Sequence, residues 1–434
     1  MTSAEDLGKV RKKLTRKRIR VLYVCPFAHY PGHPPWAAVY ETQALARAGA
    51  EVELLTFCGV IGKAEVKVPQ LTVRPYIKLA IPLYYLASLL RKWRLTRRLS
   101  MSVEAFLTLA VTVRLKRKLN CDIIHLRDGD TFLFLVHLFN LPLHGYNWVV
   151  SLISRNLITH LPLLTALRKD FRLFLYTIFL RIVNSGLWKP VYRRSLARNH
   201  FLFLTQDEST KRNFELYAQG IFSGKVFCLP LGVDKVEKII SKEEARRYLG
   251  LPQDKSVFLS FGFLHAGKDL ETVFRALKEV PDAFLIRAGD PGFNPGLNSA
   301  NLTHRYGILD RIIIKDCYIP EEEKPYYFFA ADAIILSYTK QFGSTVSLLW
   351  EACRFGTPVI ASNNSQLRQL VEAFQLGLLF TVQDADSLRK AIMRFTNLKP
   401  EEIERLKENC LRFTSEFSLE KWAQRCLEIY MAFW

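Results

Sequence analysis

The amino-acid sequence predicts an α/β protein built from two doubly wound, Rossmann-like domains. Short apolar runs of strand length alternate with segments of about 10–15 residues that carry helical spacing, which is typical of parallel sheets made of βαβ units. This alternation occurs twice, and a polar, charged stretch that begins at Lys235 separates the two sets. With 434 residues, 49% of them hydrophobic, the chain can bury two cores of domain size.

The first domain is expected over residues 19–235, after a basic leader at residues 1–18. Its first strand is the apolar run Arg20–Cys25, and Trp36–Ala48 follows with helical spacing. Asp207 is a suitable N-cap for a helix that ends at Tyr217. Further strands are expected at Glu51–Phe57, Cys121–His125, Trp148–Leu152, Leu202–Thr205 and Val226–Leu229.

The second domain is expected over residues 236–416 and repeats the pattern more clearly. It begins with the strand Val257–Gly262 and the helix Asp269–Glu279, and Gly356 is expected to end a helix at Val346–Phe355. The remaining elements are strands at Ala283–Ala288, Ile312–Lys315, Ala333–Ser337 and Thr357–Ala361, a helix at Glu321–Ala330, and an apolar, aromatic helix at residues 417–434 that is expected to cross back to the first domain.

Positive charge is concentrated in the first half of the chain. Residues 1–235 carry 36 Lys and Arg against 15 Asp and Glu, whereas residues 236–434 carry 25 against 26. Two inserts, Val73–Lys118 and Thr159–Asn199, combine apolar blocks and aromatic residues with basic clusters. Such segments can lie on an anionic membrane surface, or they can pack on their own domain with a solvated basic face. Nucleic acid is not an expected partner, because no nucleic-acid-binding motif accompanies the charge.

Other patterns exclude several protein classes. No stretch reaches the roughly 18–20 uncharged apolar residues that span a bilayer, and no secretory signal is evident. The eight cysteines are scattered without a C-x-x-C pair, which predicts a reducing compartment and no zinc site. We therefore expect a cytoplasmic protein, peripheral on the cytoplasmic face of the membrane, without a bound metal.

The segment Phe261–Lys268 follows a strand and precedes a helix. A glycine at the strand end, Gly262, allows a tight turn, and Lys268 can reach a phosphate near the helix N-terminus, where unpaired N–H groups favour anions. The alternative for Lys268 is a solvated surface charge.

A second candidate segment runs from Gly343 to Ala361. Its small-residue loop opens a helix and offers N–H groups to a phosphate. Glu351 lies about two turns into that helix, and its carboxylate can accept two hydrogen bonds from the vicinal hydroxyls of a ribose. The alternative for Glu351 is a surface residue of an amphipathic helix.

With these motifs in place, the sequence resembles the retaining GT-B glycosyltransferases of family 4, which use nucleotide-sugar donors. The resemblance implies two domains that face a central cleft, and it runs almost from end to end in matching order and spacing. The matching stretches are Arg20–Gly32, Ala44–Thr56, Asp122–His125, Val226–Asp234, Gly262–Lys268, Ala288–Asp290, Tyr318–Asp332 and Glu351–Ser362.

The resemblance implies roles for matching residues. Lys268 would bind the donor diphosphate, Glu351 the ribose, and Ser344 and Thr345 a phosphate. Gly32 would lie in the loop of the first domain that approaches donor and acceptor. The whole donor-binding set implied in this way is Gly262, Lys268, Gly289, Gly343, Ser344, Thr345 and Glu351.

The sequence departs from the family pattern at several of these positions. Phe263 replaces an arginine of the lysine loop, and Gly343 replaces the first of two glutamates, the one that contacts the donor sugar. His33 replaces the second glycine of the first-domain loop. Ile153 or Ser154 stands where the family has a histidine that steadies the sugar.

Residues near the expected cleft are candidate substitutes for that histidine. Asp128 follows a strand and could supply a carboxylate, or it could cap a turn. We expect Lys268, Asp128 and His125 to be catalytic. Gly32, His33, Arg127 and Ser154 are expected to form the acceptor or cleft loops, and Asp130 and His160 are further candidates.

The function expected from the sequence is retaining transfer of a sugar from a nucleoside diphosphate donor to an acceptor hydroxyl that is lipid-linked, a glycan or at a membrane surface. No metal is expected to take part. Two alternatives stay open at this point, a non-catalytic glycosyltransferase-like binding or scaffold protein and a GT-B-like epimerase or phosphorylase.

Overall fold

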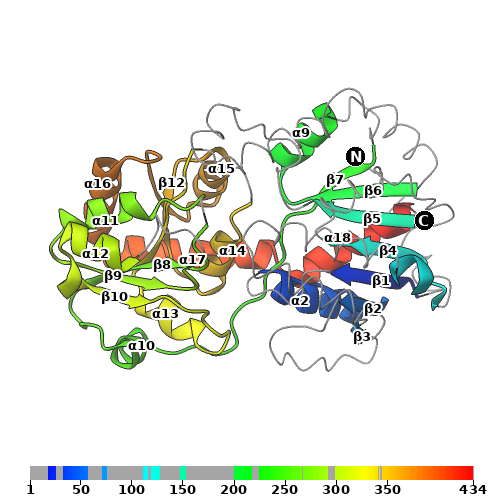
Figure 1. Cartoon of the computed structure of the whole chain (residues 1–434), viewed down its shortest axis with the longest axis horizontal. Helices are drawn as coiled ribbons and strands as arrows, with labels where there is room; N and C mark the ends of the chain where they lie inside the picture. The colour runs from blue at the N-terminus through cyan, green and yellow to red at the C-terminus, as the bar shows by residue number, and fades with distance from the viewer. Residues whose placement is uncertain are drawn as a thin grey trace. The chain divides into compact units, whose positions relative to one another are not determined.

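The computed structural model divides the chain into two compact units (Figure 1). Unit 1 comprises Met1–Pro230 and Leu419–Trp434, and unit 2 comprises Leu231–Ser418. The residues that the structure describes are 18–25, 33–56, 71–75, 111–115, 119–127, 147–152, 200–217, 224–265, 267–291, 299–340, 342 and 345–433.

Unit 1 contains a parallel sheet of seven strands in the order β3-β2-β1-β4-β5-β6-β7. The chain moves outward from β1 to β3 and then returns to the other side of β1 with β4. The strand order therefore reverses between β1 and β4, as in a doubly wound sheet. The strands are β1 (Arg20–Cys25), β2 (Glu51–Thr56), β3 (Leu71–Pro75), β4 (Ile123–Leu126), β5 (Asn147–Leu152), β6 (His200–Thr205) and β7 (Val226–Cys228).

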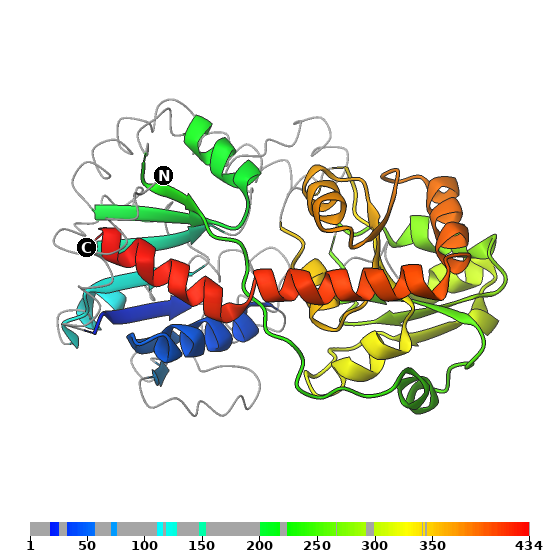
Figure 2. The ribbon, with the colours of Figure 1, turned by 180° about the vertical axis from the view of Figure 1, so that it is seen from behind.

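Two helices far apart in the sequence cover the β1 region of this sheet. Helix α2 (His33–Arg47) follows β1, and α18 (Leu419–Phe433) is the last helix of the chain. The two helices contact each other, and Figure 2 shows them side by side in unit 1. Leu419, Trp422 and Cys426 of α18 share one apolar core with β1 and α2. The predicted return of the C-terminal helix to the first domain is therefore confirmed.

Unit 2 contains a parallel sheet of six strands in the order β10-β9-β8-β11-β12-β13. Here the order reverses between β8 and β11, and ligands of open α/β sheets bind at the carboxyl ends of strands at such a point. The strands are β8 (Ser256–Phe261), β9 (Ala283–Ala288), β10 (Ile312–Lys315), β11 (Ala333–Leu336), β12 (Val359–Ser362) and β13 (Gly377–Phe380).

Helices cover both faces of the unit 2 sheet. On one face, α11 (Leu270–Lys278), α12 (Ser299–Tyr306) and α16 (Ala385–Thr396) form an apolar core with alternate residues of β8, β9 and β11. On the other face, Phe261 of β8 packs against Phe328 of α13 (Lys324–Ala330), with ring centroids 4.9 Å apart. The other helices of unit 2 are α10 (Lys242–Leu249), α14 (Ser347–Arg354), α15 (Ser365–Phe374) and α17 (Pro400–Glu416), and α9 (Glu208–Tyr217) belongs to unit 1.

The predicted class, two doubly wound α/β domains, is confirmed. Asp207 caps α9 as predicted, because its Oδ1 accepts the Thr210 backbone N–H at 2.8 Å. Helix α13 begins at Lys324 and not at Glu321, since Pro325 suits the first turn of a helix. The basic inserts, on which the membrane expectation depends, lie outside the described residues except for 73–75 and 111–115.

Candidate functional site

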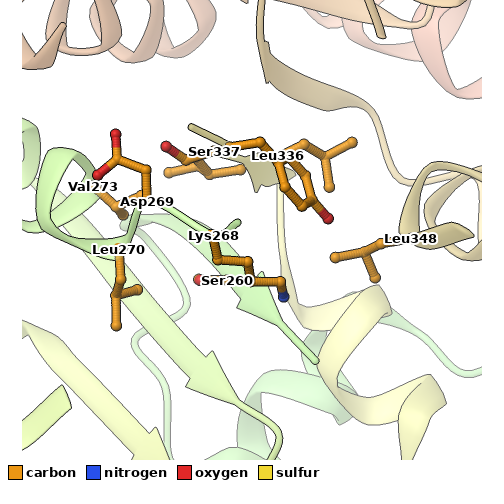
Figure 3. A pocket seen from close by; sticks show the side chains of 10 residues that line it. Ser260, Lys268, Asp269, Leu270, Val273, Leu336, Ser337 and Leu348 are labelled. Carbon is orange, nitrogen blue, oxygen red and sulfur yellow. The ribbon is translucent and has the colours of Figure 1, made fainter. Parts of the chain in front are cut away.

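A small cavity marks the reversal point of the unit 2 sheet (Figure 3). Its volume is about 10 Å³, enough for about one water molecule. In Figure 3 the Lys268 side chain extends toward the side that Leu348 lines, whereas Asp269 points away from it. The cavity is lined by Ser260, Lys268, Asp269, Leu270, Val273, Ile335, Leu336, Ser337, Tyr338 and Leu348.

Two glycines cross closely at the carboxyl ends of β8 and β9. Gly262 has a φ of +89° and Gly289 a φ of +124°, values that side-chain-bearing residues rarely adopt. The Gly262 N–H donates to the Ala288 carbonyl at 2.8 Å. A Cβ on Gly289 would lie 2.6 Å from the carbonyl carbon and oxygen of Gly262, so only glycine fits there. Because neither glycine carries a side chain, the ends of β8 and β9 approach each other closely beside the Lys268 amine.

The Lys268 amine lies beside this crossing. A Cβ built on Gly262 would be 3.4 Å from Lys268 Nζ, and the amine donates a hydrogen bond to the Phe261 carbonyl. Burial, together with the positive charge of Arg287, lowers the pKa of Lys268 to about 7. Among the described residues, the Lys268 amine donates to a backbone carbonyl and has no carboxylate partner. This is the arrangement expected of a group that receives an anion.

Aromatic rings surround the lysine loop. Tyr338 forms a β-bridge with Lys268 and lies 4.5 Å from the Phe342 ring centroid, and His265 lies 5.3 Å from the same ring. Burial, with a contribution from Lys268, lowers the pKa of His265 to about 4, so this imidazole is neutral at physiological pH. These rings were not among the site residues predicted from the sequence. Their signal in the sequence was the presence of aromatic residues in the segments that follow β8 and β11.

Glu351 lies on α14 in a cluster of charged side chains. Its Oε1 accepts a hydrogen bond from Lys324 Nζ at 3.1 Å and lies 3.7 Å from Arg354 Nη1. The Glu351 side chain is 16% exposed, and Lys324 also pairs with Glu321. Although burial opposes it, the carboxylates of Glu351 and Glu321 raise the pKa of Lys324. Glu351 is thus a carboxylate oriented by two cations and not a solvated surface residue.

The loop before α14 is only partly described. Thr345 lies two residues before the helix and is half-buried. The predicted phosphate-binding residues Gly343 and Ser344 lie outside the described residues.

In unit 1 the structure argues against a catalytic role for His125. The side chain is fully buried, its Nδ1 shares a hydrogen bond with the Tyr430 hydroxyl, and its Nε2 lies 2.6 Å from Ser151 Oγ. Burial, followed by the charge of Arg127, lowers the pKa of His125 to about 3. Because both ring nitrogens are engaged inside the core, His125 joins the sheet to α18 and does not face a ligand.

Arg127, expected in a cleft loop, is also buried. Its side chain is 2% exposed, and its Nη1 lies 2.5 Å from Glu41 Oε1 on α2. The Tyr23 hydroxyl donates to the other oxygen of Glu41, and burial raises the pKa of that phenol. Arg127 is therefore part of an internal ion pair, which corrects the expectation that it lines the cleft. The structure places His33 at the start of α2 and does not describe its side chain, and Gly32, Asp128, Asp130, Ser154 and His160 lie outside the described residues.

Two further findings concern metals and membranes. Among the residues that the structure describes, no group of three or more His, Cys, Asp or Glu side chains is arranged to hold a metal ion. Within the same part of the chain, no helix has the length and apolar character needed to cross a bilayer.

Comparison with known proteins identifies the class of the second domain. Residues 241–412, which carry the Gly262–Gly289 crossing, Lys268 and Glu351, match the family model of the glycosyl transferases group 1. This part of the chain is therefore similar to the glycosyl transferases group 1, in agreement with the resemblance predicted from the sequence.

Curated relatives match this chain over part of their length. A D-inositol 3-phosphate glycosyltransferase from Thermobispora bispora is 30% identical over 202 residues, which cover 44% of this chain and 46% of the relative. A protein of the same name from Mycolicibacterium paratuberculosis is 31% identical over 159 residues, covering 35% of this chain and 34% of the relative. The chain thus matches less than half the length of these relatives.

Solved structures share the fold of both units. Sucrose-phosphate synthase from Thermosynechococcus elongatus has a TM-score of 0.63 and 19% identity, covering 95% of this chain and 98% of that one. Anabaena HepE, in complex with UDP-glucose, has a TM-score of 0.65 and 15% identity, covering 95% of this chain and 99% of that one. These likenesses confirm the predicted GT-B fold class.

Proposed function

We propose that the protein is a glycosyltransferase that moves a sugar from a nucleoside diphosphate donor to an acceptor hydroxyl with retention of anomeric configuration. The observation that carries the proposal is the Lys268 amine beside the Gly262–Gly289 crossing, at the strand-order reversal of a glycosyltransferase group 1 domain. The relatives named D-inositol 3-phosphate glycosyltransferase support the reaction class. HepE in complex with UDP-glucose supports the class of donor.

The chemistry would depend on charge stabilisation. In the reaction the anomeric carbon loses its bond to a diphosphate oxygen, which leaves with both bonding electrons, and gains a bond to the acceptor oxygen, whose proton passes to the departing diphosphate. Negative charge therefore grows on the departing diphosphate. A preorganised, partly buried cation such as Lys268, beside the Gly262–Gly289 crossing, stabilises that charge without having to reorient during the reaction.

Glu351 would orient the nucleoside. Lys324 and Arg354 hold one of its oxygens, so the carboxylate has a fixed direction. A carboxylate in a fixed direction can accept hydrogen bonds from the two vicinal hydroxyls of a ribose. We propose no role for a metal ion, and activity in the presence of a chelator would test that part of the proposal.

The test is acceptor-dependent release of nucleoside diphosphate from a panel of nucleotide sugars. We expect Lys268→Met and Glu351→Gln to lower turnover at least tenfold, and the exposed helix variant Arg275→Gln to keep it. Proton NMR of the first-formed product reports its anomeric configuration. Donor binding without turnover on any acceptor would contradict the transferase proposal and favour a nucleotide-sugar-binding protein.

We further propose that the acceptor is presented at an anionic membrane surface, with the protein on the cytoplasmic face. The support is the excess of 36 Lys and Arg over 15 Asp and Glu in residues 1–235. Flotation with vesicles that contain an anionic phospholipid should recover the protein at low salt and lose it as salt screens the charges. Equal recovery on neutral vesicles, or none on either kind, would refute this part of the proposal.

A further inference from the structure

Arg287 is a buried cation for which the sheet provides few partners. It lies on β9 in register with Ser260 of β8, on the face that α11 and α12 cover. Its side chain is fully buried. Nη2 donates to the Gly289 carbonyl at 3.1 Å, whereas Nε and Nη1 have no hydrogen-bond acceptor among the described residues.

A second buried arginine of the same unit, Arg246, has hydrogen-bond acceptors for all three of its guanidinium nitrogens. Arg246 is 2% exposed, and its Nη2 donates to the Asp332 carboxylate at 2.8 Å. Its Nε donates to the Ala330 carbonyl at 3.0 Å, and its Nη1 donates to three more carbonyls, the nearest at 2.8 Å. The fold can therefore satisfy a buried guanidinium completely, and it does not do so at Arg287.

The charges around Arg287 do not balance it closely. The nearest carboxylate is that of Asp316, whose Oδ1 is 3.7 Å from Nε and also accepts the Ser299 hydroxyl at 3.1 Å. Burial lowers the pKa of Arg287 to about 10, against the raising effects of Asp316 and Asp290, so the group is cationic at neutral pH. The other titratable groups of this region are Lys268, whose pKa Arg287 lowers, the neutral His265, and Asp269, which caps α11 through Oδ1.

Position connects this cation to the donor site. Arg287 donates to Gly289, Gly289 crosses Gly262, and Lys268 lies beside Gly262. Helix α11 begins directly after Asp269, and helix α12 begins at Ser299. Their N-termini add the positive ends of two helix dipoles on the same face. Two cations and two helix N-termini thus meet at one edge of the sheet, and a buried cation with unmet hydrogen bonds is costly unless a ligand compensates it.

We propose that Arg287 is a positioning residue of the phosphate site, which supplies, from beneath the Gly262–Gly289 crossing, a second positive charge for the diphosphate that Lys268 contacts. The inference rests on the proposed function, because it presumes that a nucleoside diphosphate binds here. Arg287 acts through the Gly289 peptide, which it orients, and through its field, which a buried environment screens weakly. The contribution of Arg287 to the binding affinity should therefore increase with the number of phosphates on the ligand.

The experiment compares dissociation constants by isothermal titration calorimetry at pH 6.5 for a nucleoside and its mono- and diphosphate. All three ligands carry the base whose nucleoside diphosphate raises the melting temperature of the wild-type protein most. We expect Arg287→Gln to weaken diphosphate binding about tenfold or more while nucleoside binding changes little. Arg287→Lys should restore part of the loss. Arg246→Gln is the matched control, because it removes a buried arginine of unit 2 and should lower the melting temperature without changing the ratio of diphosphate to nucleoside affinity.

A second variant keeps the test decisive if Arg287→Gln does not fold. Asp316→Asn removes the opposing carboxylate but retains an acceptor for Ser299, so it should tighten diphosphate binding severalfold. An unchanged diphosphate-to-nucleoside ratio in Arg287→Gln, or in Asp316→Asn if Arg287→Gln does not fold, would overturn the role of Arg287. Absence of nucleoside diphosphate binding in the wild-type protein would instead overturn the proposed function, so the two failures are distinguishable.

Discussion

The affinity for nucleoside diphosphate should fall steeply with pH in the mildly alkaline range. The reason is Lys268, whose pKa burial and Arg287 lower to about 7. The protonated amine attracts phosphate and the neutral amine does not, so binding is strongest below this pKa and weakens as pH rises through it. The terminal phosphate is doubly charged above about pH 7. Between pH 7.5 and 9.5, Lys268 is therefore the main titrating group of the site.

The size of the effect follows from the protonated fraction. With a pKa of about 7, that fraction falls by roughly 75-fold between pH 7.5 and 9.5, whereas an ordinary lysine would change by only about 10%. The dissociation constant should rise by a similar factor, since one proton is linked to binding. His265 is already neutral throughout this range, with a pKa of about 4, and adds nothing.

The assay is calorimetric titration at half-unit pH steps, with the unphosphorylated nucleoside as a control for ionisation of the base. Lys268→Arg keeps its charge at every pH of the series, so its curve should be nearly flat. A wild-type dissociation constant that changes less than about threefold over this range would refute the reasoning. It would mean that Lys268 either stays protonated or does not contact the phosphate.

Three further predictions concern the rest of the site and the cores. Glu351→Gln should abolish the preference for a ribonucleoside diphosphate over its 2′-deoxy form, measured as a ratio of dissociation constants, and an unchanged ratio would exclude the ribose role. Gly289→Ala should cost more than about 2 kcal/mol in urea unfolding because of its clash and positive φ, whereas Gly250→Ala, with the same sign of φ and open space, should cost about 1 kcal/mol. Tyr430→Phe should lower stability by about 1–3 kcal/mol and Arg127→Met by about 3–5 kcal/mol, because each leaves a buried partner unpaired, and neither should change the affinity for nucleoside diphosphate.

The sequence predicted the fold well because local pattern and topology agree. Apolar strands and amphipathic helices alternate strictly in unit 2, so β8, α11 and β9 lie within one or two residues of their predicted bounds. Gly262 and Lys268 lie beside each other at one sheet edge, as expected for a strand-to-helix turn, and their role in phosphate binding stays a prediction. The roles of His125 and Arg127 were not predictable. The sequence alone does not indicate that a polar residue at a strand end will contact Tyr430 or Glu41, because these residues lie on helices distant from it in the sequence.

The two units differ in how closely a carboxylate approaches a buried arginine. In unit 1, Arg127 lies 2.5 Å from a carboxylate on α2, and such a pair stabilises one packing of a helix against the sheet. In unit 2, Arg287 is 3.7 Å from the nearest carboxylate, and its charge adds to burial in lowering the pKa of the neighbouring Lys268. A sheet edge where, among the described residues, no carboxylate lies within hydrogen-bonding distance of two neighbouring cations loses stability in the unliganded protein. That loss would be offset only when an anion binds, and a diphosphate, with its charge spread over two phosphate groups, suits two cations that lie on either side of a glycine crossing.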